Sequence, residues 1–523
     1  MGRLLLCIFF YCFFRSFLNL GIGGVRRIGG IAAVRFHRQG HDGAVGGAGL
    51  CGCALGYYPA GAVALELDVE VGGFQHLGCK TAALARHVRH GGHGVLVGVG
   101  VQVDAMLINF SQTFLYSFLM LLHVVMCFFL FYGMHTEPEF DYRIELYHIA
   151  KFIMYATTVM NIIGITCLMF GFKFEWYWIK FTVYENRFTG CYVNPNLLGF
   201  ISVVSIFCCH ILSKGHFMRR IAEKIPEPGI SKIWIVACLA TNAFSLILCD
   251  SNASLVLALG YAIVYIVYMF FADKAGLSPS KIILKITALF LVGVFLTGSA
   301  LMFRTICQEG FSVVVSKTTS VVDLLLGKTE SELVQEELTP EQREQLEKDK
   351  ITFSHENKNI DSGRKKLWLE SINLFKLSPI IGISNGNIVL YSAEYSNGAL
   401  EYSYHKSDLH NGFLTILVST GIIGFVLFGI FGFRFAKHSA QHLFLQKKTY
   451  RDDVYPCLFA FLFAYLIFAC FEKALLYDIS FMVVWFWLIM GYMSCYITKF
   501  EPTLESQYLF HGKRLRRVTR TML

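Results

Sequence analysis

Residues 254–272 of the chain read SLVLALGYAIVYIVYMFFA and contain no charged side chain. A helix needs roughly 20 apolar residues to cross a bilayer, so this stretch predicts a membrane-spanning helix. Other long apolar runs occur from Met106 onward, at residues 107–133, 146–171, 194–213, 233–249, 282–303, 411–433, 454–471 and 478–497. The sequence therefore predicts an all-α fold, a polytopic membrane helix bundle with about nine or ten transmembrane helices.

The composition agrees with a membrane protein. Hydrophobic residues make up 55% of the 523 residues, charged residues make up 16%, and the mean hydropathy is +0.52. A soluble domain needs more charge than this to cover its surface. The 16 Cys are scattered through the apolar runs without paired zinc spacing, so we interpret them as small apolar residues of helices. We expect no metal, no cofactor and no nucleic-acid partner.

Residue usage changes abruptly near Met106. Residues 1–105 begin with an apolar run from Leu4 to Leu20, after which Gly, His, Arg, Ala and Val dominate. This stretch has neither a helical period nor the composition of a flexible Gly/Ser linker. We expect an anomalous N-terminal segment without a packed core, either unstructured or produced by a miscalled start. A signal anchor followed by a disordered segment is the alternative.

Lys and Arg are concentrated in alternate gaps between the apolar runs, at residues 214–232, 273–281, 434–453 and in the tail 498–523. If the helices alternate in direction, these segments share one side, and the positive-inside rule makes that side cytoplasmic. The opposite, outer side then holds residues 172–193, 250–253, 304–410 and 472–477.

The predicted domains follow from this alternation. Residues 106–303 form a first transmembrane bundle, 411–497 the C-terminal transmembrane helices, and 498–523 a basic cytoplasmic tail. The segment 304–410 is predicted to be a large, partly helical extracytoplasmic loop between the sixth and seventh spans counted from Met106. A helix is expected from Thr339 onward, because Thr can cap a helix and Pro suits its first position.

The first polar patch on the predicted outer side is Arg187-Phe-Thr-Gly190, followed by Asn194-Pro195-Asn196. An Arg and two Asn at the mouth of a helix suit a bound anion, helped by the exposed amides of the helix start. The simpler interpretation is that Asn194 caps the helix and Pro195 occupies its first position. That interpretation leaves Arg187 and Asn196 unexplained.

Two further patches follow later in the chain. The second is Arg364-Lys365-Lys366 with Trp368, where cations beside an aromatic ring suit a phosphate or a lipid headgroup. The third is His410-Asn411, directly before the 411–433 run. A His in this position can act as a general base near neutral pH, or it can be an ordinary interfacial residue.

Taken together, these motifs form an ordered pattern. It reads Arg-Phe-Thr-Gly…Asn-Pro-Asn-x-x-Gly, then Gly-Arg…Leu-Trp…Ser-Pro-x-x-Gly, then His-Asn-x-Phe-Leu…Gly-x-x-Gly. In order, spacing and predicted side, the pattern from Arg187 to Gly424 resembles the O-antigen ligase and O-antigen polymerase superfamily. The family's Ser-x-Ser-Arg-Gly signature is weak here, because Asn252 stands where an Arg is often found. Arg304 is our candidate to replace that Arg.

The resemblance implies a metal-independent membrane glycosyltransferase. Its donor would be a polyprenyl-diphosphate-linked glycan, its acceptor a hydroxyl of a glycan or lipid-linked glycan, and its location the plasma membrane, with the active site facing outside. Carried over residue by residue, the pattern predicts catalytic roles for His410, Arg364 and Arg187 in one cavity. The predicted substrate-binding residues are Asn194, Asn196, Asn411, Trp368, Lys365 and Arg304.

Three alternatives stay open from the sequence. One is a sensor or anchor with a ligand-binding outer loop, which would not need His410 and Arg364 close together. Another is the choice between a polymerase and a ligase. The third is a transporter or flippase of lipid-linked glycans, which should show internal repeats and polar or broken helices at mid-membrane.

Overall fold

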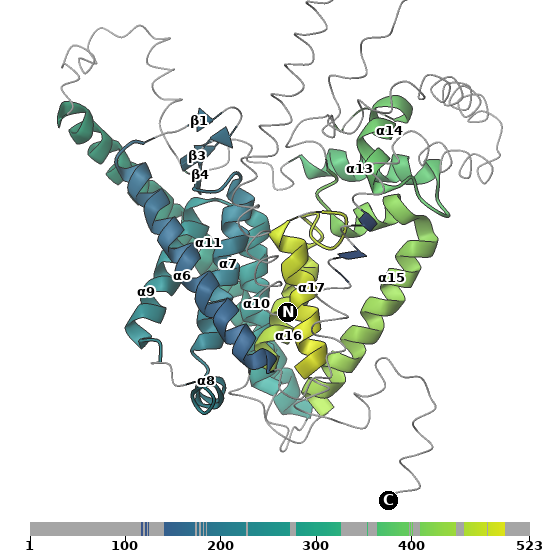
Figure 1. Ribbon diagram of the computed structural model, residues 1–523, viewed down its shortest axis with the longest axis horizontal. Coiled ribbons are helices and arrows are strands. Elements are labelled where there is room, and N and C mark those ends of the chain that lie inside the picture. The colour runs from purple at the N-terminus through teal and green to yellow at the C-terminus, as the bar shows by residue number, and fades with distance from the viewer. Residues whose placement is uncertain are drawn as a thin grey trace, which may run out of the picture. The chain divides into compact units, whose positions relative to one another are not determined.

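The computed structural model describes chiefly residues 141–172, 175–225, 229–271, 279–325, 363–396, 408–445 and 454–496, apart from short gaps. Each apolar run predicted from residue 146 onward contains one helix. These are α6 (Tyr142–Met169), α7 (Pro195–Leu212), α9 (Lys232–Leu248), α10 (Asn252–Phe271), α11 (Pro279–Leu325), α15 (Gly412–Leu445), α16 (Tyr455–Phe468) and α17 (Phe481–Cys495) (Figure 1). Residues 1–105, most of the 107–133 run and the helix expected from Thr339 lie outside the described residues.

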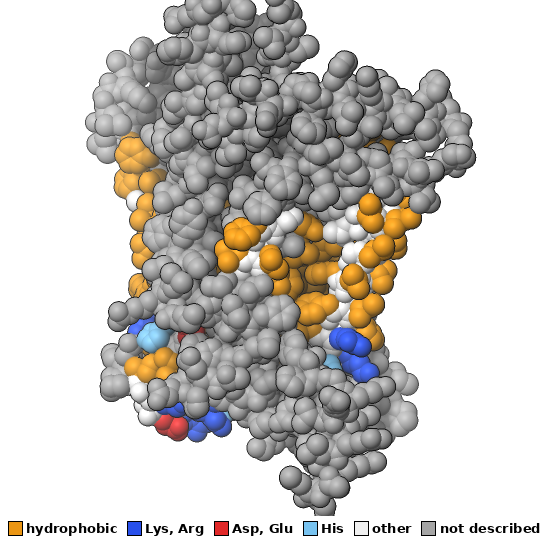
Figure 2. Space-filling model, turned by 45° about the vertical axis from the view of Figure 1, so that its right-hand side comes forward, with side chains coloured by type: hydrophobic (Ala, Val, Ile, Leu, Met, Phe, Trp, Pro, Cys, Tyr) orange, Lys and Arg blue, Asp and Glu red, His pale blue; other side chains and the backbone are white. Residues whose placement is uncertain are grey.

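The predicted all-α membrane architecture is confirmed. In the described part of the chain, α6, α7, α10, α11 and α15 are long and apolar enough to cross a membrane, and α9, α16 and α17 are shorter apolar helices. Figure 2 shows hydrophobic side chains along the described helices visible in that view, and Lys and Arg side chains at the lower end of these apolar columns. Exposed apolar side chains of this kind suit a lipid environment.

The chain divides into two compact units. Of the described residues, chiefly 141–325, 434–445, 454–468 and 486–496 belong to the larger unit, and 363–396, 408–433 and 469–485 to the smaller unit.

Aromatic and small residues join the helices of the larger unit. The ring of Phe200 on α7 packs against those of Tyr465 and Phe468 on α16, with centroids 5.8 Å and 5.3 Å away. Gly260 on α10 lies so close to α16 that a Cβ there would be 3.3 Å from the Cβ of Ala464. Close approach through small residues is the usual way in which membrane helices gain packing energy.

A buried polar network ties α6, α7 and α9 together. The Asn161 amide donates to the Asn242 side-chain oxygen at 3.0 Å and to the Ser202 hydroxyl at 3.3 Å. Asn242 in turn donates to the Thr158 hydroxyl at 3.0 Å. Since polar groups in an apolar interior must find partners there, this network fixes the rotation of the three helices about their axes.

Two short antiparallel hairpins between α6 and α7 were not predicted from the sequence. They pair β1 (Glu175–Trp176) with β2 (Ile179–Lys180), and β3 (Thr182–Tyr184) with β4 (Arg187–Gly190). The second hairpin rests on α6, because a Cβ at Gly164 would lie 2.7 Å from the Cα of Gly190. This backbone contact places Arg187 at one end of the α6–α7 pair.

Helix α11 continues past its apolar run to Leu325, into the segment predicted to begin the large loop at residue 304. Polar residues such as Arg304 and Gln308 occupy this continuation. The sequence suggested a boundary because hydropathy falls there, but polar side chains can remain helical, and Gly310 within this continuation does not end the helix. Arg304 therefore lies inside a helix.

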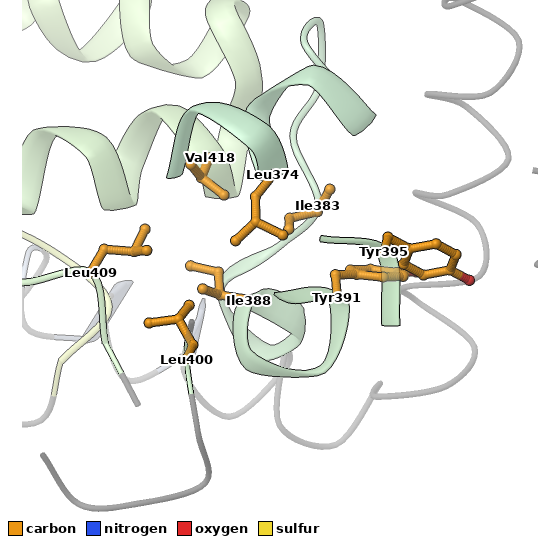
Figure 3. Close-up of a cluster of buried hydrophobic side chains, with 8 residues drawn as sticks. All are labelled: Leu374, Ile383, Ile388, Tyr391, Tyr395, Leu400, Leu409 and Val418. Carbon is orange, nitrogen blue, oxygen red and sulfur yellow. The ribbon is translucent and has the colours of Figure 1, made fainter. Parts of the chain in front are cut away.

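In the smaller unit, α13 (Arg364–Leu377) and α14 (Ile388–Tyr395) lie at the N-terminal end of α15 (Figure 1). One apolar cluster holds them there, and Figure 3 shows its side chains converging from these helices and the segments between them. Its members are Leu374, Ile383, Ile388, Tyr391, Tyr395, Leu400, Leu409 and Val418. Leu374 anchors the helix that carries Arg364, and Leu409 is the neighbour of His410, so the cluster positions both predicted site residues.

Helix α15 is broken at Gly421, where φ is 63° and ψ is −168°. The chain of residues 379–384 fills the break. Ile383 N–H donates to the Val418 carbonyl at 2.9 Å, and on the other side of the break Ile422 N–H donates to the Pro379 carbonyl at 2.8 Å. Backbone groups freed by a break inside a membrane need such partners.

Glycine is required on both sides of this join. A Cβ at Gly382 would lie 2.4 Å from the backbone of residues 419–420, and a Cβ at Gly421 would lie 2.3 Å from the Ile380 carbonyl. Both glycines also have positive φ, which side chains disfavour. The Ser-Pro-x-x-Gly and Gly-x-x-Gly motifs are thus the two halves of one backbone contact.

Candidate functional site

Arg364 and His410 meet at a carboxylate in the smaller unit. Arg364 is the first residue of α13, and its Nη2 lies 3.0 Å from Glu472 Oε1. His410 precedes α15, and its Nδ1 lies 3.3 Å from Glu472 Oε2. The Arg364 and Glu472 side chains are only 12% and 9% exposed, so the pair is shielded from solvent. Residues from three separate segments thus form one charged cluster.

The backbone at His410 is unusual. Its φ is 43°, in the left-handed region that residues with a side chain seldom occupy, and its N–H donates to Asp408 Oδ1. The next residue, Asn411, caps α15, because its side-chain oxygen accepts from the N–H groups of Phe413 and Leu414 at 3.0 Å each. Strained conformations of this kind are common at functional sites.

The charges around His410 favour its protonated form. Burial disfavours the charge and Arg364 repels it, but Asp408 and Glu472 outweigh both and raise the pKa of His410 to about 9. At neutral pH the imidazole is therefore mainly cationic.

Trp368 lies one turn after Arg364 on α13, and its ring packs near that of Phe471 with centroids 6.2 Å apart. Both Arg364 Nε and Trp368 Nε1 are buried donors without a hydrogen-bond partner in the described part of the chain. Side chains four residues apart share one helix face, so the two donors can serve one acceptor group. Lys365 is exposed on a different part of the helix.

Arg187 belongs to the larger unit, where uncharged oxygens hold it. Its Nε donates to the Cys249 carbonyl at 3.0 Å, and its Nη2 donates to the Asn196 side-chain oxygen at 2.9 Å. Asn194 caps α7 by accepting from the Asn196 N–H at 2.7 Å, as the simpler sequence interpretation expected. Asn196, which capping left unexplained, orients Arg187.

A second arginine of the larger unit lies beside the weak signature. Arg304 Nη1 donates to the Asn252 side-chain oxygen at 2.9 Å, and Arg304 pairs with Asp250. Asp250 also accepts from Gln308 at 3.1 Å. The structure thus puts a guanidinium from α11 next to Asn252, the position at which the family pattern often has an Arg.

The described residues contain no group of three or more His, Cys, Asp or Glu side chains that could hold a metal ion.

The comparison with protein families bears on residues of both units. The family model described as O-antigen ligase matches residues 237–429. This match supports the resemblance to the O-antigen ligase and O-antigen polymerase superfamily. Searches of curated proteins and of solved structures found no match.

The matched O-antigen ligase region includes Arg304, Arg364, His410 and the Gly382–Gly421 join, whereas Arg187 and Glu472 lie outside it. Sequence reasoning missed Glu472, Asp250 and Gln308. The signal for Glu472 was its position directly after the 454–471 run, in the short segment predicted to share a side with the 304–410 loop. The prediction that Arg187 shares a cavity with Arg364 and His410 stays a prediction.

Proposed function

We propose that the protein transfers a glycan from a polyprenyl-diphosphate donor to a hydroxyl acceptor on the outer face of the plasma membrane, as a polymerase or a ligase. The observation that carries the proposal is the meeting of Arg364 and His410 at Glu472 within 3.3 Å contacts. Both cations lie in the region that the O-antigen ligase family model matches.

The chemistry is a single displacement. The acceptor oxygen forms a bond to the anomeric carbon while the bond from that carbon to the diphosphate oxygen breaks. The electron pair of the broken bond leaves with the polyprenyl diphosphate. The acceptor proton passes to the neutral form of His410, whose population increases as the pH approaches its pKa of about 9. Arg364 stabilises the charge that grows on the leaving group, because a guanidinium matches phosphate oxygens. We expect inversion at the anomeric carbon.

The remaining residues have supporting roles in this proposal. Arg187, oriented by Asn196, and Arg304 supply further positive charge for the anionic donor. Trp368 contacts the diphosphate or the sugar beside Arg364, and Lys365, exposed on a different part of α13, adds positive charge for the anionic donor. The exposed apolar faces of the helices accommodate the prenyl chain.

A transporter of lipid-linked glycans is the competing proposal, and the broken helix α15 is the feature that favours it. In a transporter, such a break commonly exposes helix ends to a substrate. Here the Ile422 N–H and the Val418 carbonyl at the break already bond to residues 379–384. We therefore favour the enzyme, in which the break anchors α13 to α15.

The test is transfer by the purified full-length protein in detergent or vesicles, supplied with a polyprenyl-diphosphate oligosaccharide and an acceptor. The expected result is an elongated or ligated glycan, released polyprenyl diphosphate, and loss of both in His410→Ala. Movement of the donor across vesicles without any new glycosidic bond would support the transporter instead. Sidedness is tested in cells with single cysteines at Arg219 and Lys350. We expect an impermeant thiol reagent to label only the second.

A further inference from the structure

Glu472 holds both cations of the site with different oxygens. Its Oε1 contacts Arg364 at 3.0 Å, and its Oε2 contacts His410 Nδ1 at 3.3 Å. An ordinary surface ion pair joins two solvent-exposed side chains and contributes little to stability. Here a carboxylate that is 9% exposed joins the first residue of α13 to the residue that precedes α15.

The segment that carries Glu472 is itself fixed to α15. Gly412 N–H donates to the Ala469 carbonyl at 2.7 Å, and a Cβ at Gly412 would lie 3.0 Å from Leu475. Ala469 and Leu475 are both fully buried. Glu472 lies between these two contacts, so its backbone is held beside His410.

We propose that Glu472 is the positioning residue of the transfer reaction. It fixes the orientation of the His410 ring and holds that ring beside Arg364. This inference rests on the proposed function but names a residue outside the matched O-antigen ligase region. An Nδ1–H directed at Glu472 places the lone pair of the neutral imidazole on Nε2. Nε2 is then the atom that receives the acceptor proton, by the same logic that makes an acidic residue orient a catalytic histidine.

The charge of Glu472 affects how the transfer rate should depend on pH. Among the described residues, the charged groups that act on His410 include Asp408 from its own segment, Glu472 from the segment before α17, and Arg364 from α13. Glu472 stabilises the imidazolium, so removing its charge must lower the pKa of His410. If neutral His410 is the base, the rising limb of the pH–rate profile then moves to lower pH.

The experiment compares Glu472→Gln, Glu472→Asp and the control Glu370→Gln. Glu370 is also a buried carboxylate of the smaller unit, but its oxygens accept from Ser392 at 2.5 Å and Ser396 at 3.0 Å. Two readouts are taken on the purified full-length protein. One is the transfer rate between pH 6 and 10. The other is the carbethoxylation of His410 against pH, resolved by peptide mass spectrometry without substrates.

In the wild type, both readouts should rise with a midpoint near pH 9. Glu472→Gln should move both midpoints down by about one unit or more, since a nearby opposite charge shifts a pKa by roughly 1–3 units. Glu370→Gln should leave both midpoints unchanged. Glu472→Asp keeps the charge but cannot span both contacts, so its midpoint should stay higher than that of Gln while its rate falls about 10²-fold through misplacement.

The two proposals fail separately. An unchanged carbethoxylation midpoint in Glu472→Gln overturns the positioning role, even if His410-dependent transfer is present. A shifted midpoint in a protein that makes no glycosidic bond supports the Glu472–His410 link and overturns the proposed reaction. If Glu472→Gln does not fold, a Glu472→Asp variant as fast as the wild type overturns the positioning role.

Discussion

Arg187 of the larger unit and Arg364 of the smaller unit donate to different kinds of oxygen. In the larger unit, Arg187 donates to a backbone carbonyl and to the amide oxygen of Asn196, neither of which carries a charge. In the smaller unit, Arg364 pairs with Glu472, which also contacts His410. A neutral acceptor orients a guanidinium without cancelling its charge, whereas a carboxylate orients and neutralises it. The two neutral acceptors therefore orient the Arg187 cation, whereas Arg364 is tied to a titratable partner.

The largest expected effect is at His410. His410→Ala should lower the transfer rate by about 10²–10⁴-fold, because the acceptor proton then has no general base. The measurement is single-turnover glycan transfer by the purified protein. His148→Ala, which changes an exposed imidazole on α6 of the larger unit, is the control and should keep the wild-type rate. Full-length product from the His410→Ala protein would show that the titratable cluster of the smaller unit does not supply the general base.

The next effect separates the two arginines. Arg364→Ala should lose roughly 10²-fold in rate, as removal of a preorganised charge stabiliser typically does. Arg364→Lys should recover part of this loss, because it can keep the ion pair with Glu472 although not the two-pronged contact with phosphate. Arg187→Lys should lower both the transfer rate and the folded yield. Arg187 is 6% exposed, and a lysine cannot reach both acceptors at once.

The measurements are transfer rates and the monodisperse fraction on size-exclusion chromatography. Equal rates for Arg364→Ala and Arg364→Lys would show that the charge of Arg364 does not matter. Unchanged folding and rate in Arg187→Lys would show that the orienting bonds of the larger unit are dispensable.

The last prediction concerns the stability of the join that holds the smaller unit's site, and not the transfer rate. Gly421→Ala should destabilise the protein by about 3 kcal/mol or more, because the new Cβ meets the Ile380 carbonyl and φ is positive. Gly429→Ala lies on the same helix with nothing within 4 Å of the new Cβ, and should stabilise by roughly 0.5–1 kcal/mol. Thermal unfolding in detergent measures both. Equal melting temperatures would show that the join does not fix α15.

The helices were predictable because each apolar run is long enough to stand out against its polar flanks. The ends of α11 and the hairpin strands were not. The helix continues through Arg304 because polar residues can remain helical, and β3 and β4 are too short to produce an alternating pattern.

The candidate site was likewise predictable from the sequence only in part. His410 and Arg364 were found from residue type and order, and Asn194 proved to be the helix cap that its spacing indicated. Glu472 was missed, because a single acid after an apolar run has no local pattern and becomes informative only when three segments meet. The glycine motifs were visible, but their physical reason, a backbone contact between residues 382 and 421, needed the fold.

The join at Gly421 also constrains the lengths of two segments of the chain. Residues 364–382 run from the guanidinium of Arg364 to the join, and residues 410–421 run from the imidazole of His410 to the same point. Both stretches are largely helical, and one inserted residue rotates the remainder of a helix by about 100°. Such an insertion would turn one cation away from Glu472. Along these two stretches, homologous chains should therefore tolerate exchanges of side chain far more readily than insertions or deletions.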